Sequence, residues 1–290
     1  MQHQSIADRL GWEAIVDLAL GEDIGTGDIT TLSTVPAGTI AHADLLAKAD
    51  GVISGIDVAQ YVFQRVDPDL AFSGFAENGT RITRGTRFGR ISGNARSLLT
   101  AERTALNLLQ RLSGVATVTA TYVAAVEGTG TRVVDTRKTT PGLRLLEKRA
   151  VADGGGRNHR FGLSDGVLIK DNHLEAVGGA NRVTRAIEQA RQLAPHTLRI
   201  EVEVTTLAEC EEALAASADI ILLDNMSTEM MADAVALRNR HGSRALLEAS
   251  GGVTLPRLRE IAETGVDFIS VGALTHSAPA LDISLEMTLG

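Results

Sequence analysis

Two short apolar runs, LRIEVEV (198–204) and DIILLD (219–224), decide the fold class of this chain. Runs of this length and composition are typical of buried β-strands. Four more follow the same pattern: TRVVDT (131–136), GVLIK (166–170), ALLEAS (245–250) and DFISVG (267–272). Between the runs lie amphipathic segments with helical spacing, such as ANRVTRAIEQARQLA (180–194) and LPRLREIAETG (255–265). Strand then helix, repeated, predicts parallel βαβ units. We expect a closed or nearly closed α/β barrel, with an open doubly wound sheet as the alternative.

The preceding part of the chain has a different pattern. AHADLLAKA (41–49) and GTRFGRIS (85–92) alternate as strands do, around a predicted helix at GIDVAQYVFQRV (55–66). This indicates a small α+β domain. Residues 95–127 predict two long helices, joined near Ser113 and Gly114, that connect this domain to the barrel. GTGDITT (25–31) follows no strand and is predicted to be a loop.

Composition limits the function. The 290 residues carry a formal net charge of -8, which argues against nucleic-acid or membrane-surface binding, because both depend on a cationic field. The first twenty residues lack the features of a signal peptide, and no apolar stretch is long enough to cross a bilayer, so we expect a cytoplasmic protein. The single cysteine, Cys210, excludes an internal disulfide and is predicted to be a packing thiol.

Polar side chains follow every apolar run, where barrel enzymes place their catalytic groups. Arg137, Lys138 and Lys170 come at strand ends, and the loop GGGRNHR (154–160) adds His159 and Arg160. In an acidic protein, such cations would converge on a multiply charged anion, for which Arg suits bidentate carboxylate or phosphate binding. The alternative is a set of surface salt bridges.

Two acidic side chains end consecutive runs, Glu203 and Asp224. Hard oxygen ligands without nearby His or Cys favour Mg²⁺, which typically bridges to substrate phosphates. Pairing with the neighbouring cations is the alternative role. Glu201 faces the same side of its strand as Glu203, so alternation does not choose between them.

The last two runs end in glycine turns, SGG (250–252) and GALTHS (272–277). Barrels often bind phosphate between the loops after their last two strands, where glycine lets backbone N–H groups approach the oxygens. This pair of turns predicts a phosphate monoester site.

These segments together resemble the quinolinate phosphoribosyltransferase family. The resemblance rests on DTRKTTPGLR (135–144), GGGRNHRFGLSDGVLIKDNH (154–173), EVEV (201–204), ILLDNM (221–226), LEASGG (247–252) and TGVDFISVGALTHS (264–277), preceded by GEDIGTGDITT (21–31) and AERTALNLLQRLSG (101–114). It spans nearly the whole chain. It implies conversion of quinolinate and phosphoribosyl pyrophosphate to nicotinate mononucleotide, pyrophosphate and CO₂ with Mg²⁺, in NAD biosynthesis.

The resemblance also implies a domain plan. An N-terminal α+β sandwich (1–112), to which residues 278–290 return, would precede an incomplete α/β barrel (113–277). It implies a homodimer in which Arg103 reaches the partner's substrate, with any larger assembly left open.

Site residues follow from the same resemblance. Quinolinate would contact Arg137, His159, Arg160 and Lys170. Lys138, Glu203 and Asp224 would handle the ribose, pyrophosphate and Mg²⁺, and together with Lys170 form the catalytic set. The remaining substrate-binding positions, several of them for phosphate, would be Thr136, Ser250, Gly251, Gly252, Val271, Gly272 and Ala273.

Three other functions compete with this one. A related phosphoribosyltransferase of the same fold would act on another substrate. A barrel lyase would form a Schiff base at Lys170. A non-catalytic phosphate-binding module would leave the two carboxylates without a role.

Overall fold

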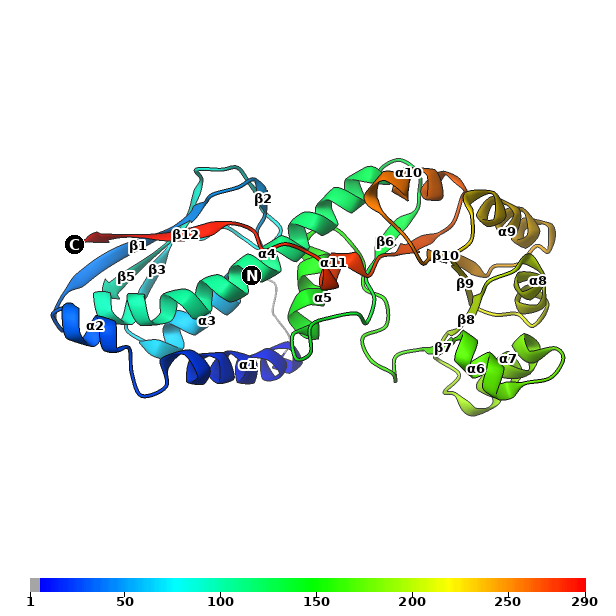
Figure 1. The fold of residues 1–290 in the computed structure, drawn as a ribbon, viewed down its shortest axis with the longest axis horizontal. Coiled ribbons are helices and arrows are strands. Elements are labelled where there is room, and N and C mark those ends of the chain that lie inside the picture. The colour runs from blue at the N-terminus through cyan, green and yellow to red at the C-terminus, as the bar shows by residue number, and fades with distance from the viewer. Residues whose placement is uncertain (1–5) are drawn as a thin grey trace. The chain divides into compact units, whose positions relative to one another are not determined.

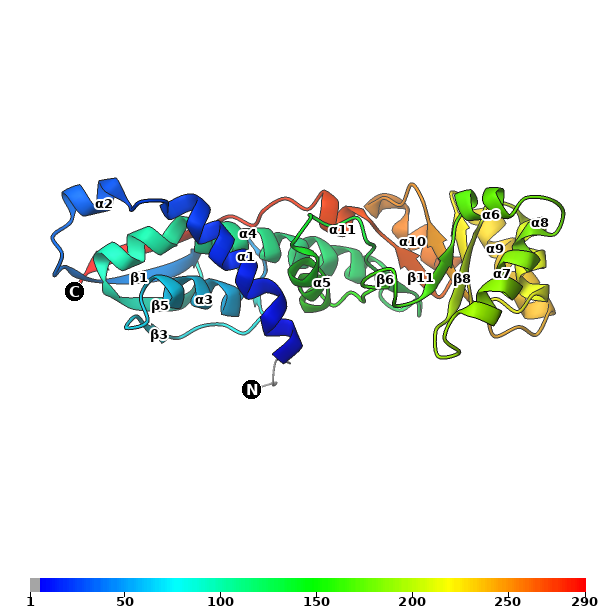
Figure 2. The same ribbon diagram turned by 90° about the horizontal axis from the view of Figure 1, so that it is seen from below.

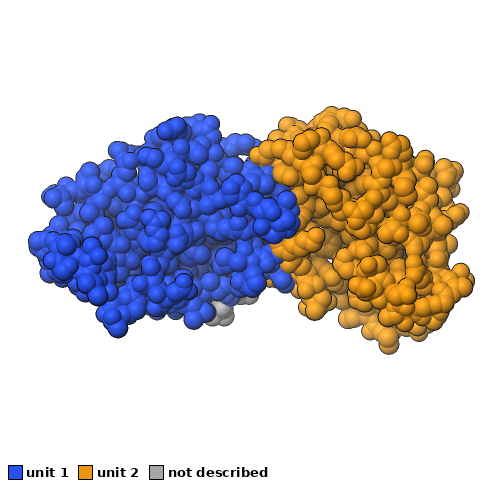
Figure 3. All heavy atoms as spheres, viewed as in Figure 1, with its two compact units in different colours: residues 1–120, 139–155, 273–290 blue, residues 121–138, 156–272 orange. Residues whose placement is uncertain are grey.

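The structure, a computed structural model, describes residues 6–290, and the side chains from residue 11 onward. The first five residues of the N-terminal stretch considered above lie outside this range. The chain forms two compact units: unit 1 comprises Met1–Ala120, Thr139–Gly155 and Ala273–Gly290, and unit 2 comprises Thr121–Lys138 and Gly156–Gly272 (Figure 3). Residues 139–155 therefore group with unit 1, although the sequence-based division assigns them to the barrel.

Unit 1 contains a four-stranded antiparallel sheet in the order β12-β1-β5-β3 (Figure 1). Its strands are β1 (Ile40–Ala47), β3 (Ala71–Ser73), β5 (Arg87–Asn94) and β12 (Ile283–Leu289), and a second pair is β2 (Gly51–Val52) with β4 (Arg81–Ile82). Alternate residues of β1 are buried, which gives this sheet one core face. The last strand of the chain pairs with β1 in the register Ala47↔Ile283.

Within residues 6–290, six helices belong wholly or mainly to unit 1: α1 (Ile6–Ile24), α2 (Ile29–Thr34), α3 (Ile56–Val66), α4 (Ala95–Ala125), α5 (Arg144–Asp153) and α11 (Ala273–His276). Helix α1 contacts α3, where the rings of Trp12 and Tyr61 meet edge to face at 5.2 Å. The prediction of a loop at 25–31 is partly wrong. Asp28 caps α2 by accepting a hydrogen bond from the Thr31 N–H at 2.9 Å, so the last three residues of that stretch are helical.

The predicted break near Ser113 and Gly114 is wrong, because α4 is one continuous helix of 31 residues. A Cβ added at Gly114 would lie 2.0 Å from the Pro279 carbonyl oxygen, so glycine here allows a close approach of the C-terminal segment. The Ser113 hydroxyl accepts from the Ser54 N–H at 3.1 Å. Both small residues serve tertiary contacts within unit 1 rather than a turn.

Unit 2 contains the six predicted strands in one parallel sheet of order β6-β11-β10-β9-β8-β7. They are β6 (Arg132–Val134), β7 (Val167–Ile169), β8 (Ile200–Val204), β9 (Ile220–Asp224), β10 (Leu246–Ser250) and β11 (Phe268–Ser270). The first strand pairs with the last, as in a barrel, whereas a doubly wound sheet reverses its order in the middle. Strands β6 and β7 do not pair in the described chain, so the barrel is incomplete, as expected.

Helices α7 to α10 contact one another in chain order along the outside of this sheet (Figures 1 and 2). They are α7 (Arg182–Leu193), α8 (Leu207–Ala215), α9 (Thr228–Arg240) and α10 (Leu255–Glu263), with α6 (Asp171–Val177) beside α7. Cys210 on α8 is buried, and burial raises the pKa of its thiol to about 11, in keeping with a packing role. None of the helices described here is long and apolar enough to cross a membrane.

Candidate active site

A cavity of about 560 Å³ lies in unit 2 and brings together most of the predicted site residues. The predicted residues that line it are Thr136, Arg137, Lys138, His159, Arg160, Lys170, Glu203, Asp224, Ser250, Gly251 and Gly252. Parallel strands end at the same edge of a sheet, so residues far apart in sequence share this cavity.

Four predicted residues do not line the cavity. Arg103 lies exposed on α4 in unit 1. Val271 is buried, and its N–H donates to the Val134 carbonyl at 2.9 Å, which extends the pairing of β11 with β6. Gly272 and Ala273 follow it at the start of α11 and are half-buried.

Cations gather on one side of the cavity. Arg160 donates from Nη1 to the Gly166 carbonyl at 3.3 Å. Burial, and then the charge of Arg137, lower the pKa of the Arg160 guanidinium, so the surroundings of Arg160 disfavour its positive charge. An anion with two carboxylates would relieve this conflict.

Lys170 follows β7 and forms an ion pair with Glu203, with Nζ 2.5 Å from Oε2. The lysine side chain keeps 46% of its surface exposed, whereas Glu203 is almost fully buried. The alternative role for Glu203, pairing with a cation, is therefore present in this structure. Asp224 lines the same cavity, and its Oδ2 accepts from the Asn225 side-chain amide at 2.7 Å.

The two glutamates of β8 have different surroundings. Glu203 lines the cavity with Asp224, whereas Glu201 does not line it and lies with its Oε2 3.0 Å from His159 Nε2. Of the two carboxylates that sequence alternation left open, only Glu203 therefore lines this cavity.

The glycine turn after β10 is held by local geometry. Gly251 and Gly252 adopt φ values of 82° and 56°, which favour glycine. A Cβ on Gly251 would lie 2.4 Å from Asn225 Oδ1, and the Asn225 N–H donates to the Ser250 carbonyl at 2.9 Å. Both glycines line the cavity.

The segment that carries His159 is fixed to β6. Asp135, fully buried at the end of β6, accepts from the His159 N–H at 2.8 Å, and the Asp135 N–H donates to the Arg157 carbonyl at 3.0 Å. The charged segment DTRK (135–138) after β6 thus has a structural member, Asp135, beside the cations Arg137 and Lys138 that line the cavity.

Five lining residues lie outside the predicted set: Leu168, Leu222, Asn225, Glu248 and Ser270. Glu248 lies inside β10, two residues before Ser250, and so faces the same side of the strand. The signal was available: Glu248 is the one charged residue in the run ALLEAS. The prediction considered only residues at strand ends and therefore did not include Glu248.

Comparisons with known proteins identify the family of this chain. Residues 28–113 match the model of the quinolinate phosphoribosyl transferase N-terminal domain, and residues 115–286 match that of the C-terminal domain. The chain belongs to this family. A probable nicotinate-nucleotide pyrophosphorylase (carboxylating) from Synechocystis is 48% identical over 92% of this chain and 90% of its own. The chloroplastic enzyme of that name from rice is 43% identical over 95% and 77%.

Solved structures agree as well. NadC from Streptococcus pyogenes has a TM-score of 0.91 at 43% identity, covering 97% of this chain and 98% of its own. The nicotinate-nucleotide pyrophosphorylase from Francisella tularensis has a TM-score of 0.90 at 38% identity, covering 99% of both. The chain is a quinolinate phosphoribosyltransferase of NAD biosynthesis that uses quinolinate and phosphoribosyl pyrophosphate. Family membership decides against a Schiff-base lyase at Lys170.

Proposed function

We propose that the site cavity of unit 2 binds quinolinate at its cationic side and phosphoribosyl pyrophosphate between Glu203, Asp224 and the Gly251–Gly252 turn. The observation that carries this assignment is the convergence of cations, carboxylates and a glycine turn on one cavity of about 560 Å³. A diacid and an activated sugar phosphate are the ligands that this combination suits.

Arg137, Arg160 and Lys170 would hold the two carboxylates of quinolinate. A guanidinium offers paired N–H donors to each carboxylate, which fixes the plane of the pyridine ring and directs its nitrogen at the anomeric carbon of the sugar. Such positioning contributes about 7 to 11 kcal/mol to catalysis in well-oriented reactions, and no side-chain nucleophile is needed.

The carboxylates fit Mg²⁺. Glu203 and Asp224 provide hard oxygen ligands in one cavity, and Lys170 would leave the Glu203 carboxylate for a metal ion to take its place. When bound, Mg²⁺ would neutralise the pyrophosphate leaving group. Lys138, on the same wall, adds a positive charge for these oxygens. Removal of the metal with a chelator should abolish pyrophosphate release.

Arg160→Gln tests the cationic side. Loss of a charge-assisted contact costs about 1.5–3 kcal/mol, so the KM for quinolinate should rise about 10- to 100-fold with little change in that for phosphoribosyl pyrophosphate. Arg259→Gln is the matched control, because Arg259 lies exposed on α10 in a pair with Glu263. An unchanged KM for quinolinate in Arg160→Gln would refute the assignment. Lys170→Met should also lose turnover. If this variant turned over like wild type, the proposed role of Lys170 would be wrong.

Arg103 would complete the site of a second copy in a homodimer. Its exposed position on α4 supports this role. Arg103→Ala and Lys170→Met should each be inactive, yet mixed subunits should regain about a quarter of wild-type activity. Half of the random dimers would be mixed, and each would keep one of two intact sites. No recovery on mixing would exclude a shared site.

The cytoplasmic location stays a prediction. The plant relatives are named as chloroplastic or mitochondrial, and those words concern the plant proteins. Fractionation of source cells with an antibody to this chain tests the location, and a signal in a membrane-bound compartment would contradict it.

A further inference from the structure

Two buried carboxylates and a histidine form a cluster inside the barrel, next to the site cavity. Glu201 comes from β8, Glu248 from β10, and His159 from the segment beside β6. The glutamates are 4% and 2% exposed. His159 Nε2 lies 3.0 Å from Glu201 Oε2 and 3.6 Å from Glu248 Oε1.

Hydrogen bonds orient the His159 ring. The backbone N–H of Arg160 donates to His159 Nδ1 at 2.8 Å, and the ring presents its Nε2–H to the glutamates. That N–H donates to Glu201. The Nε2–H therefore faces two carboxyl groups, with Glu201 Oε2 at 3.0 Å and Glu248 Oε1 at 3.6 Å.

Two adjacent buried carboxyl groups cannot both be ionised at low cost. Burial first, and then the charge of Glu201, raise the pKa of Glu248 to about 7, against the opposing effects of His159, the Ser270 hydroxyl and Lys170. One oxygen of each glutamate, Oε1, has no hydrogen-bond partner in the structure. A buried polar atom left this way costs stability, and such groups are concentrated where a protein uses them.

Glu248 stands between two cavities. It lines the site cavity, and with His159 and Arg160 it also lines a second cavity of about 280 Å³. The second cavity is lined by residues at the beginnings of the strands, including Val167, Ile220 and Phe268. Glu248 is thus placed to face substrate on one side and to exchange a proton on the other.

We propose that Glu248 is the acid that protonates C2 of the pyridine ring after CO₂ has left. This inference rests on the proposed binding of quinolinate in the site cavity. When the bond from C2 to its carboxylate breaks, CO₂ departs and the electron pair stays on C2, stabilised by the cationic ring nitrogen. The Glu248 O–H bond then breaks, a C2–H bond forms, and Glu248 remains as a carboxylate that water reprotonates. Glu201 and His159 are positioning residues for this acid.

Glu248→Gln tests the proposal, because it preserves the shape of the side chain and removes the transferable proton. In single turnovers, pyrophosphate release should stay within about threefold of wild type, since ribosylation precedes the affected step. Net CO₂ release should slow by about 100-fold or more, the usual contribution of a general acid, because the carbanion at C2 recaptures CO₂ until it is protonated. Glu248→Asp, which keeps an acid, should recover part of the rate. Equal rates for both products in a variant that still binds quinolinate would overturn the proposal.

Wild-type enzyme supplies a test that does not depend on the folding of a variant. The donor must be protonated, so the rate constant for CO₂ release should fall as pH rises above about 7, while that for pyrophosphate release should not follow it. Parallel profiles would overturn the proposal. Stoichiometric metal that survives chelator treatment and is lost in Glu248→Gln would also overturn it, because a metal ion would replace the proton.

Failure of this inference differs from failure of the proposed function. If Arg160→Gln raises the KM for quinolinate and Glu248→Gln releases CO₂ at the wild-type rate, only the proton donor is wrong. If Arg160→Gln changes nothing, quinolinate does not bind as proposed, and the role of Glu248 falls with it.

Discussion

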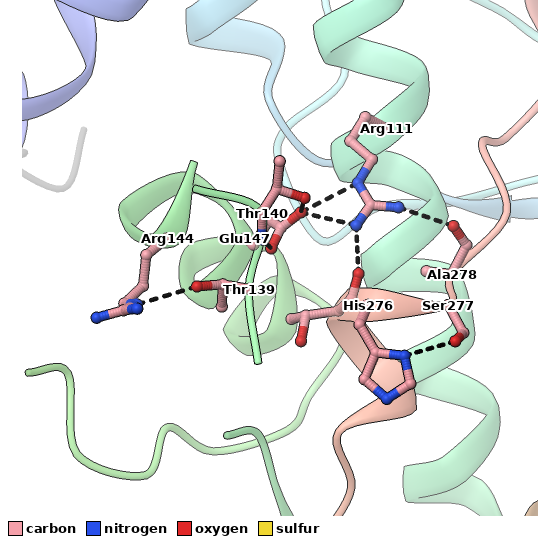
Figure 4. A network of polar contacts seen from close by, with 9 residues as sticks. Arg111, Thr139, Thr140, Arg144, Glu147, His276, Ser277 and Ala278 are labelled. Carbon is pink, nitrogen blue, oxygen red and sulfur yellow. Dashed lines mark hydrogen bonds and ion pairs between the residues drawn. The ribbon is translucent and has the colours of Figure 1, made fainter. Parts of the chain in front are cut away.

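Each unit buries acidic side chains within a polar network, but the two networks differ in how their oxygens are partnered. In unit 1, Glu147 is fully buried and both oxygens accept hydrogen bonds: Oε1 from Arg111 and the Thr140 hydroxyl, each at 2.7 Å, and Oε2 from the Thr140 N–H at 3.0 Å (Figure 4). Arg111 also donates to the carbonyls of Thr275 and Ala278. This network joins α4, α5 and the segment around α11.

In unit 2, Glu201 and Glu248 are nearly as buried, yet each keeps an oxygen without a hydrogen bond. A fully partnered buried charge holds elements together, and its removal leaves other groups unpaired. A buried carboxylate with an oxygen that makes no hydrogen bond lowers stability, and its presence despite that cost points to a role in the reaction. The comparison therefore separates architecture in unit 1 from chemistry in unit 2.

Glu147→Ala should have the largest effect on stability. It leaves Arg111 and the Thr140 N–H without their acceptor, so the free energy of unfolding should fall by about 3–5 kcal/mol. Urea denaturation followed by circular dichroism measures this loss. The fraction that stays folded should release pyrophosphate and CO₂ in the wild-type ratio. A changed ratio would contradict the claim that the Glu147 network is structural only.

Two tightly packed glycines extend the comparison. Gly114→Ala should destabilise unit 1 by about 1–3 kcal/mol, because its Cβ meets the Pro279 carbonyl. Gly251→Ala should instead raise the KM for phosphoribosyl pyrophosphate about tenfold, because the turn beside Asn225 must shift. Thermal unfolding and steady-state kinetics on both variants check this. The same pattern of effects in both variants would count against the comparison.

Glu248→Gln should have the smallest effect on stability, and the effect should depend on pH. The folded-state pKa of Glu248 is raised from 4.5 to about 7, so the folded protein binds the proton more tightly than the unfolded chain does. Wild-type stability therefore falls as pH rises from about 5 to 7, and the variant lacks this loss. Urea denaturation at pH 5 and pH 8 measures the free energy of unfolding of both proteins. The value for the variant, relative to that for wild type, should be higher at pH 8 than at pH 5 by about 1 kcal/mol or more. A constant difference would indicate an ordinary ionised carboxylate.

Much of the fold could be predicted from the sequence because the signals are local. Each barrel strand is a short apolar run, and polar residues at the strand ends converge because parallel strands share an edge. The lining of the cavity by Arg137, Lys170, Glu203 and Asp224 follows from that rule. The return of β12 to β1 came from family resemblance, since nothing local in residues 283–289 indicates a partner more than 200 residues away.

The errors have a common physical cause. Ser113 and Gly114 suggested a break because small residues usually mark turns, but here they accept contacts from segments distant in sequence. Glu248 was missed because it lies within a strand, where a charged residue acquires meaning only from neighbours on other strands. The roles of such residues depend on tertiary contacts, and a local sequence pattern carries no information about those contacts.

The most direct test of the central claim is calorimetric titration of wild type and Arg160→Gln with quinolinate and with nicotinate, which lacks one of the two carboxylates. The account predicts that wild type binds quinolinate at least about tenfold more tightly than nicotinate, and that Arg160→Gln loses most of this preference. Equal affinities in wild type, or a preference that survives in the variant, would contradict the claim that the cationic side of this cavity selects the diacid.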